Sequence, residues 1–133
     1  TFRAQLLFYG VLGNRLDTSS YREFGDGRVG LSHERMKMFF DIYVPKGCDV
    51  NDPAITPMNG ELRAMPPAWI CAAECDVLRD DSVRFYGKLR NLRDGDQFVL
   101  AEGLNHGFIN RVRHLPPAKA IIDSAAAFLK ANV

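Results

Sequence analysis

The chain has 133 residues, of which 47% are hydrophobic and 25% are charged, proportions typical of a globular protein of about one domain. Its 17 basic and 16 acidic side chains give a formal net charge of +1. This charge is too small to attract the phosphates of nucleic acid strongly, so nucleic acid is not an expected partner. No apolar run approaches the roughly 20 residues that a membrane-spanning helix needs, and we expect a soluble chain without a membrane span.

The cysteines are odd in number and form neither a Cys-x-x-Cys pair nor the spacing of a metal site: Cys48, Cys71 and Cys75. We therefore expect free thiols, which suit the reducing cytoplasm. Cys75 stands beside Asp76, so a nucleophilic thiol has to be considered. Because a neighbouring carboxylate disfavours the reactive thiolate, a packed and unreactive thiol is the preferred interpretation.

The first half of the chain predicts one strand and one helix. The apolar run over residues 2–12 is typical of a strand buried on both faces, and the polar, turn-rich stretch 13–30 predicts an excursion over the surface or over a site. Ser32 is a plausible N-cap for a helix that should end before Pro45, since apolar residues then recur at helical spacing: Met36, Phe39, Phe40 and Tyr43. Residues 49–67 hold four prolines and predict a loop.

The second half alternates strands with helices. The apolar run 68–73 predicts a second strand, and residues 97–101 predict a third. The aspartates at 80–81 should open a helix between them, with an apolar face of Phe85, Leu89 and Leu92. The prolines at 116–117 should start a last helix, whose buried side is Ala118, Ile121, Ile122, Ala125, Phe128 and Leu129. This alternation predicts an α/β fold in three layers, with about three mostly parallel strands and flanking helices.

An acid and a histidine follow two of the expected strands. Asp76 and His106 should lie at the carboxyl edge of the sheet, where open α/β sheets bind ligands, and a carboxylate that orients a histidine base is a catalytic arrangement. Structural interpretations stay open: Asp76 as a helix N-cap, and His106 as a loop histidine beside the flexible Gly107. Met36, Phe39 and Phe40 either face the core, as residues in this pattern ordinarily do, or line a substrate pocket.

At these residues the sequence resembles the hormone-sensitive-lipase-like branch of the α/β-hydrolase serine esterases. The family pattern Asp-x-Leu-x-Asp is matched at 76–80, and Gly-x-x-His-Gly-Phe is matched at 103–108. Residues 3–9 are similar to the family strand after the nucleophile, and residues 20–24 to the segment that follows it. An Asp-Pro and a Thr-Pro pair within 52–57 fall where the family has comparable pairs. The resemblance covers nearly the whole chain.

The resemblance implies hydrolysis of a small-molecule carboxylic ester, with Asp76 as the triad acid and His106 as the general base. It also implies that Phe108 and the segment 20–40, which ends with Phe39 and Phe40, lie near the substrate. No metal or organic cofactor is implied. Another serine hydrolase of the same fold, such as an acyl-peptide hydrolase, would keep Asp76 and His106 and change only the substrate.

The chain departs from the family where the nucleophile is concerned. Neither the serine elbow, Gly-x-Ser-x-Gly, nor the oxyanion motif His-Gly-Gly-Gly occurs in residues 1–133, and no serine has the elbow context. We therefore expect residues 1–133 to be the C-terminal portion of an α/β-hydrolase domain, inactive alone because the nucleophile and oxyanion donors are missing. The free edge of the first strand would then pair with a missing N-terminal half or with a second copy. The alternative is a non-catalytic binding or assembly module that retains the fold.

Overall fold

Parallel strands form the centre of the fold. The computed structural model describes residues 2–133, and within them the sheet has three strands: β1 (Gln5–Phe8), β2 (Ala68–Cys75) and β3 (Gln97–Asn105). β2 lies in the middle and pairs in parallel with both neighbours, with Gln5 opposite Ala68 and Trp69 opposite Gln97. The predicted α/β class with about three parallel strands is confirmed.

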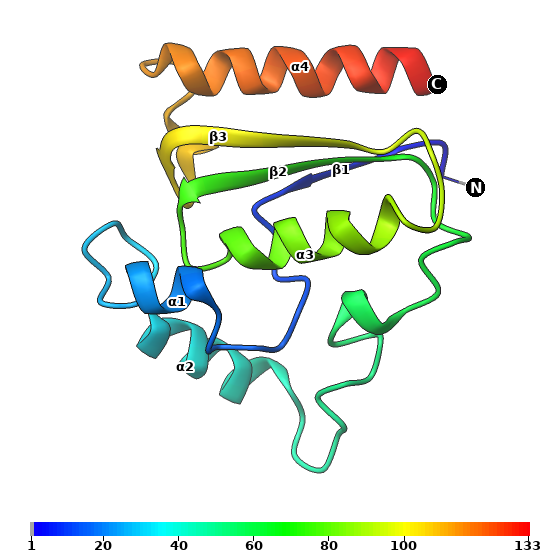
Figure 1. Ribbon diagram of the computed structural model, residues 1–133. Helices are drawn as coiled ribbons and strands as arrows, with labels where there is room; N and C mark the ends of the chain where they lie inside the picture. The colour runs from blue at the N-terminus through cyan, green and yellow to red at the C-terminus, as the bar shows by residue number, and fades with distance from the viewer. Residues whose placement is uncertain (1) are drawn as a thin grey trace.

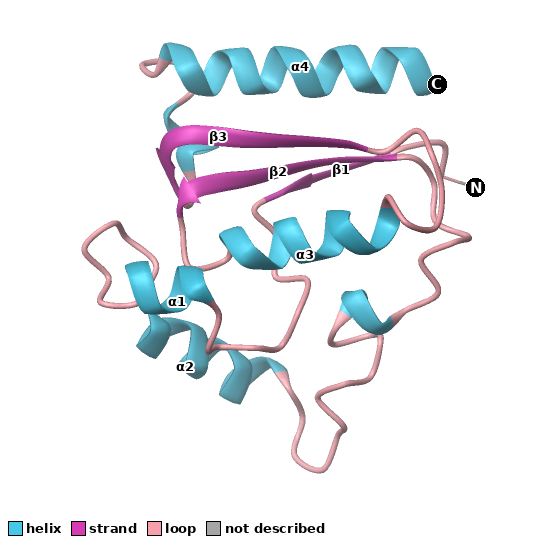
Figure 2. Ribbon diagram, in the orientation of Figure 1, coloured by secondary structure: helices cyan, strands magenta, loops and turns pink. Residues whose placement is uncertain are grey.

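Helices cover both faces of the sheet, so the fold has three layers (Figure 1). α4 (Pro116–Asn132) runs along one face and α3 (Arg79–Leu89) along the other, with the strands between them (Figure 2). Successive side chains of β2 point to opposite faces of the sheet. Because a helix covers each face, both faces need apolar side chains, which explains the continuous apolar run at 68–73. Side chains on the α4 side include Trp69, Cys71, Ala73, Ala118 and Phe128. Side chains on the α3 side include Ala68, Ile70, Phe85 and Leu89.

A long excursion between β1 and β2 carries the other helices. α1 (Ser19–Phe24) and α2 (His33–Tyr43) lie on the side of α3 that faces away from α4 (Figure 1). α2 begins and ends where the sequence predicted, because the Ser32 hydroxyl caps it by accepting the Arg35 N–H at 3.2 Å. A 3-10 turn, Pro57–Asn59, interrupts the expected loop before β2.

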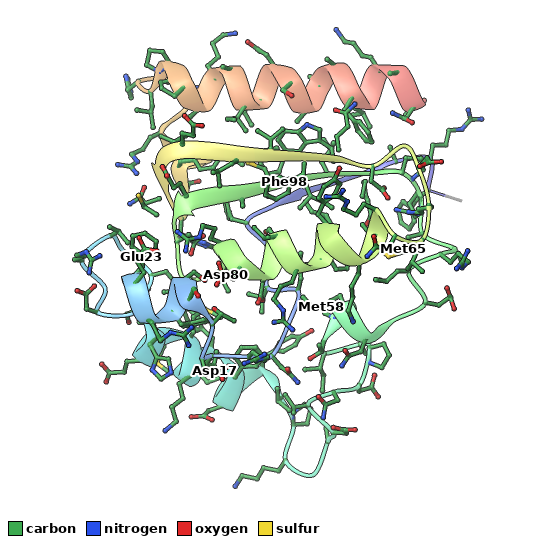
Figure 3. All side chains as sticks on the ribbon, viewed as in Figure 1. Asp17, Glu23, Met58, Met65, Asp80 and Phe98 are labelled. Carbon is green, nitrogen blue, oxygen red and sulfur yellow. The ribbon has the colours of Figure 1, made fainter. Side chains whose placement is uncertain are left out.

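α1 lies within residues 13–30, where the sequence predicted an excursion and no helix was assigned. Its buried Tyr21 and Phe24 pack in a cluster with residues of the loop after β2. Arg79, at the start of α3, joins α3 to α1, since its guanidinium pairs with Glu23 of α1 at 2.9 Å, and it also pairs with the adjacent Asp80 at 3.3 Å. Glu23 and Asp80 are labelled in Figure 3. The excursion is therefore fixed against the carboxyl edge of the sheet.

Three element boundaries also differ from the predictions. β1 occupies four residues instead of the expected run 2–12, because Tyr9 takes a left-handed backbone conformation with φ +38° and ends the strand. α3 ends at Leu89, so Leu92 packs from the turn beyond the helix. β3, the edge strand opposite β1, runs to Asn105, four residues beyond the predicted end at Ala101.

A bulge near the end of β3 accounts for its extra length. Ala73 is opposite Ala101, but Cys75 is opposite Asn105, so β3 has two additional residues there. Gly103 supplies the left-handed turn with φ +67°, and its N–H donates to the Glu74 carboxylate at 2.6 Å. The bulge redirects the end of the strand that leads into His106.

Some apolar side chains remain at the surface, and several belong to α2. Met38 is 47% exposed, Ile42 75% and Tyr43 66%.

Within the described residues 2–133, none of the helices combines the length and the apolar character that crossing a membrane requires.

Candidate active site

Asp76 and His106 meet at the carboxyl edge of the sheet. Asp76 directly follows β2, and His106 directly follows β3, so parallel pairing brings the two loops together. His106 Nδ1 lies 2.7 Å from Asp76 Oδ2, within hydrogen-bonding distance. The Asp76 side chain is fully buried, whereas the imidazole is 32% exposed. The structure therefore brings together the two residues singled out in the sequence.

The two carboxylate oxygens of Asp76 have separate partners. Oδ1 accepts the Leu78 N–H at 3.0 Å, which holds the turn leading into α3, and Oδ2 faces the imidazole. With Asp76 ionised, Nδ1 of His106 donates the hydrogen and Nε2 is left as the acceptor. The interpretation of Asp76 as a helix N-cap is wrong, because the N-cap position of α3 belongs to Leu78 and the Asp76 bond orders the turn before the helix. One side chain orders the turn and fixes the histidine tautomer.

Tyr9, which the sequence analysis overlooked, contributes an aromatic wall to the site. Its ring centroid is 4.6 Å from that of His106 and 5.3 Å from that of Phe108. Burial raises the pKa of the Tyr9 phenol above its usual value, so the ring is uncharged near neutral pH. Tyr9 follows β1 as Asp76 follows β2, and this shared position at the carboxyl edge was the available signal.

The loop after His106 is anchored in the core. Gly107 has φ +78° and starts a 3-10 helix, Phe108–Arg111, so the flexible glycine expected beside His106 is used. Phe108 is fully buried in the cluster beneath α4. Its ring supports Tyr9, and its predicted contact with substrate stays a prediction.

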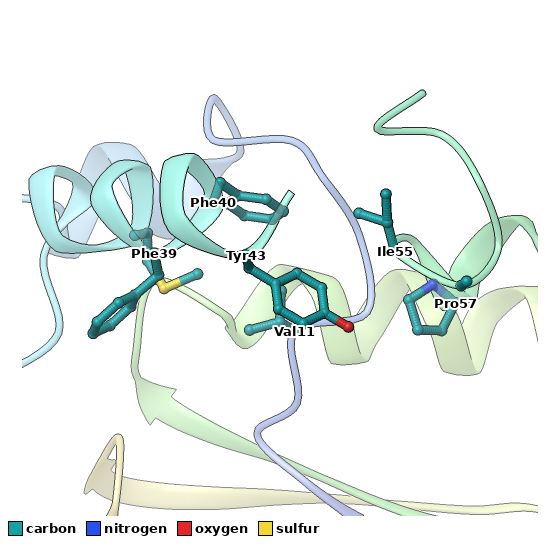
Figure 4. A pocket seen from close by; sticks show the side chains of 8 residues that line it. Val11, Phe39, Phe40, Tyr43, Ile55 and Pro57 are labelled. Carbon is teal, nitrogen blue, oxygen red and sulfur yellow. The ribbon is translucent and has the colours of Figure 1, made fainter. Parts of the chain in front are cut away.

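Phe39 and Phe40 line an apolar pocket of about 280 Å³ (Figure 4). The pocket lies between α2, Val11 and the segment before β2; its remaining lining residues are Met36, Tyr43, Ala54, Ile55 and Pro57. Asp76 and His106 do not line it. Phe39 is 41% exposed, and Phe40 also packs against the cluster that contains Tyr21 and Phe24; contact of either ring with a substrate stays a prediction.

No nucleophile in the described residues 2–133 is engaged with the histidine. The hydrogen-bond partner of His106 there is Asp76, and Ser20, which is fully buried, donates its hydroxyl to the Val77 carbonyl at 2.6 Å. All three cysteines are free thiols. Burial raises the pKa of Cys71 to about 12, so this thiol is uncharged and unreactive at neutral pH. The pair is available to a nucleophile but does not contact one.

Comparisons with known proteins show the family and the fold of the chain. Residues 1–110 match the model of a family with the alpha/beta hydrolase fold. One of two fungal esterases from Rhizomucor miehei superposes on 98% of this chain with 29% identity and a TM-score of 0.88. A thermostable esterase from Pseudomonas putida does so with 30% identity and a TM-score of 0.89. The chain covers 41% and 42% of the lengths of these two proteins.

Proposed function

Because the chain belongs to the alpha/beta hydrolase fold family, in its hormone-sensitive-lipase-like branch, we propose that it is the C-terminal portion of a carboxylic ester hydrolase. Asp76 and His106 are then two members of a catalytic triad. The observation that carries this proposal is the 2.7 Å contact between Asp76 Oδ2 and His106 Nδ1, at the sheet edge where such enzymes bind ligands. The partly exposed imidazole leaves Nε2 available to a reacting group.

The chemistry of these groups follows from their protonation. His106 Nε2 takes the proton of a serine hydroxyl as the serine oxygen attacks the ester carbonyl, and then gives that proton to the leaving alkoxide. The second half-reaction repeats the transfer with water, which releases the acid and restores the serine. The Asp76 carboxylate stabilises the imidazolium formed in both steps and keeps the hydrogen on Nδ1.

The serine and the oxyanion donors belong, in this proposal, to a polypeptide segment outside these 133 residues. The absence of a Gly-x-Ser-x-Gly sequence supports this assignment, as does the small share of each related esterase that the chain covers. The outer edge of β1 is the place for that segment to pair, or for a second copy of the chain. Three free thiols suit a reducing cytoplasm.

We assign the pocket beside α2 to the apolar part of a small carboxylic ester, with Phe39 and Phe40 as its walls. The pocket has the apolar lining that such a group needs.

The test is esterase activity of the uninterrupted reading frame that contains this chain. We expect it to encode Gly-x-Ser-x-Gly before Thr1 and to hydrolyse p-nitrophenyl acetate and butyrate. His106→Ala and Asp76→Asn should each lower kcat by roughly 10⁴-fold. His114→Ala and Asp123→Asn are matched controls at exposed positions and should leave kcat unchanged.

The same assay contains the results that would contradict the proposal. A reading frame without the elbow and without turnover would favour a non-catalytic module that retains the fold. Turnover by residues 1–133 alone, abolished in His106→Ala, would show that the nucleophile lies within the chain.

A further inference from the structure

Ser20, at the start of α1, is fully buried and has three hydrogen-bonding neighbours. Its hydroxyl donates to the Val77 carbonyl at 2.6 Å, accepts the Asp80 N–H at 3.3 Å, and lies 3.1 Å from the Thr18 hydroxyl. Val77 lies in the turn that follows β2, and Asp80 lies in the first turn of α3 directly after it. A buried hydroxyl with all its capacity used is costly to remove, because its partners cannot turn to water.

The backbone of Ser20 makes a second link to the same turn. Its N–H donates to the Asp80 carboxylate at 2.9 Å, while the Asp80 N–H donates to the Ser20 hydroxyl. The two residues therefore satisfy each other's backbone donors, as the members of a capping box do within one helix. Here the exchange joins the first turns of two different helices, α1 and α3.

The turn that Ser20 holds is the one that carries Asp76. Val77 directly follows Asp76, and its carbonyl accepts the Ser20 hydroxyl. Asp80 lies four residues after Asp76. The contact between Asp76 Oδ2 and His106 is 2.7 Å long, so a displacement of the turn by about 1 Å would break it. The ion pair of Arg79 with Glu23 bridges the same elements, but the Glu23 side chain is 51% exposed, so this pair holds them less firmly than the buried hydrogen bonds of Ser20 do.

From this interlock we infer that Ser20 is a positioning residue that, through Val77 and Asp80, holds Asp76 at hydrogen-bonding distance from His106. The inference rests on the proposed function, which makes Asp76 and His106 catalytic. It also gives the excursion between β1 and β2 a second task. The segment that builds the apolar pocket beside α2 fixes the acid of the catalytic pair through the first turn of α1.

The test reads the contact between Asp76 and His106 directly, without an activity assay. In the full chain labelled with ¹⁵N-histidine, a hydrogen on His106 Nδ1 that is bonded to a carboxylate gives a strongly deshielded proton resonance. Asp76→Asn should abolish it, which assigns the signal. We expect Ser20→Ala to remove the resonance or to accelerate its exchange with water about tenfold, since one buried hydrogen bond is lost.

Ser19→Ala is the matched control, because Ser19 is the exposed neighbour of Ser20 and its hydroxyl accepts a hydrogen bond from the Arg22 guanidinium at 3.3 Å, not from the turn after β2. It should leave the resonance unchanged. Asp80→Ala is the second variant, in case Ser20→Ala does not fold; it removes the acceptor of the Ser20 N–H and should weaken the resonance in the same direction.

An unchanged resonance in a cooperatively folded Ser20→Ala chain would overturn the inference, as would an unchanged resonance in Asp80→Ala if only that variant folds. Failure of the proposed function gives a different pattern. The resonance would then still depend on Ser20, while turnover by the uninterrupted protein would not depend on His106.

Discussion

At the scale of single residues, the edge of the sheet places conformational strain beside Asp76 and His106. Tyr9 is the one residue other than glycine with positive φ in residues 2–133, at +38°. Such a conformation costs a residue with a side chain on the order of 1–3 kcal/mol. Contacts of its ring with His106 and Phe108, and its N–H bond to the Cys71 carbonyl at 2.7 Å, offset this cost.

We predict that the usual order of glycine and alanine is reversed at Tyr9. Both Tyr9→Gly and Tyr9→Ala lose the ring, so the difference between them isolates the backbone. At φ +38° glycine is unstrained, so Tyr9→Gly should be the more stable variant. Its free energy of unfolding should exceed that of Tyr9→Ala by about 1 kcal/mol. Urea unfolding measures both. The control is Phe8, inside β1, where Phe8→Ala should be more stable than Phe8→Gly. If the alanine variant is the more stable one at Tyr9 as well, the backbone strain at Tyr9 is refuted.

Sequence reasoning found some of these residues and missed others for a physical reason. Asp76 and His106 could be predicted because each follows an apolar run whose strand character is local, and parallel pairing then brings the two ends together. The contacts of Ser20 with Val77 and Asp80 join positions 57 and 60 residues apart, and no local pattern encodes them. The reversed φ of Tyr9 is equally invisible, since tyrosine rarely takes it.

At the scale of elements, local periodicity predicted the longer helices, and tertiary contacts made the short one. α2, α3 and α4 have 11 residues or more and carry apolar faces at helical spacing. α1 has six residues, too few to repay helix nucleation alone. It forms because its buried side chains pack against the turn after β2, information that lies outside its own sequence.

The amino ends of β2 and β3 are joined by a buried ion pair. Arg93 Nη2 lies 2.8 Å from Asp96 Oδ1, and the same oxygen accepts the Ala68 N–H at 2.7 Å. Arg93 also donates to the carbonyls of Met65 and Pro66. The Asp96 side chain is 1% exposed, so each member of the pair depends on the other for compensation.

We therefore predict that Asp96→Ala is strongly destabilising. It leaves the Ala68 N–H and the Arg93 guanidinium without their carboxylate, and should lower the free energy of unfolding by about 3 kcal/mol. Asp123→Ala is the control, because Asp123 pairs with Lys119 on the surface and should cost less than about 0.5 kcal/mol. Chemical denaturation of the two variants measures the difference. Similar losses would mean that the pair near β2 is not a structural anchor.

At the scale of the whole molecule, the sheet has two open edges in the described residues, one along β1 and one along β3. β1 pairs with β2 on one side, and its other side is the edge of the sheet. The N–H groups of Gln5 and Tyr9 point to β2, since they donate to Pro67 and Cys71 carbonyls at 2.9 and 2.7 Å. Because N–H groups alternate along a strand, those of Leu6 and Phe8 point outward, where another strand can accept them.

This edge predicts concentration-dependent self-association of the 133-residue chain when no other segment covers β1. Leu6→Pro removes an outward N–H without touching the bonds to β2, so it should keep the chain monomeric. Leu6→Ala is the matched control, because it loses the same side chain but keeps the donor and should still associate. Sedimentation velocity at rising concentration distinguishes the three proteins. A wild-type chain that stays monomeric at every concentration would rule out pairing through β1. If Leu6→Pro associates as strongly as Leu6→Ala, the interface lies on another surface, such as the exposed apolar side chains of α2.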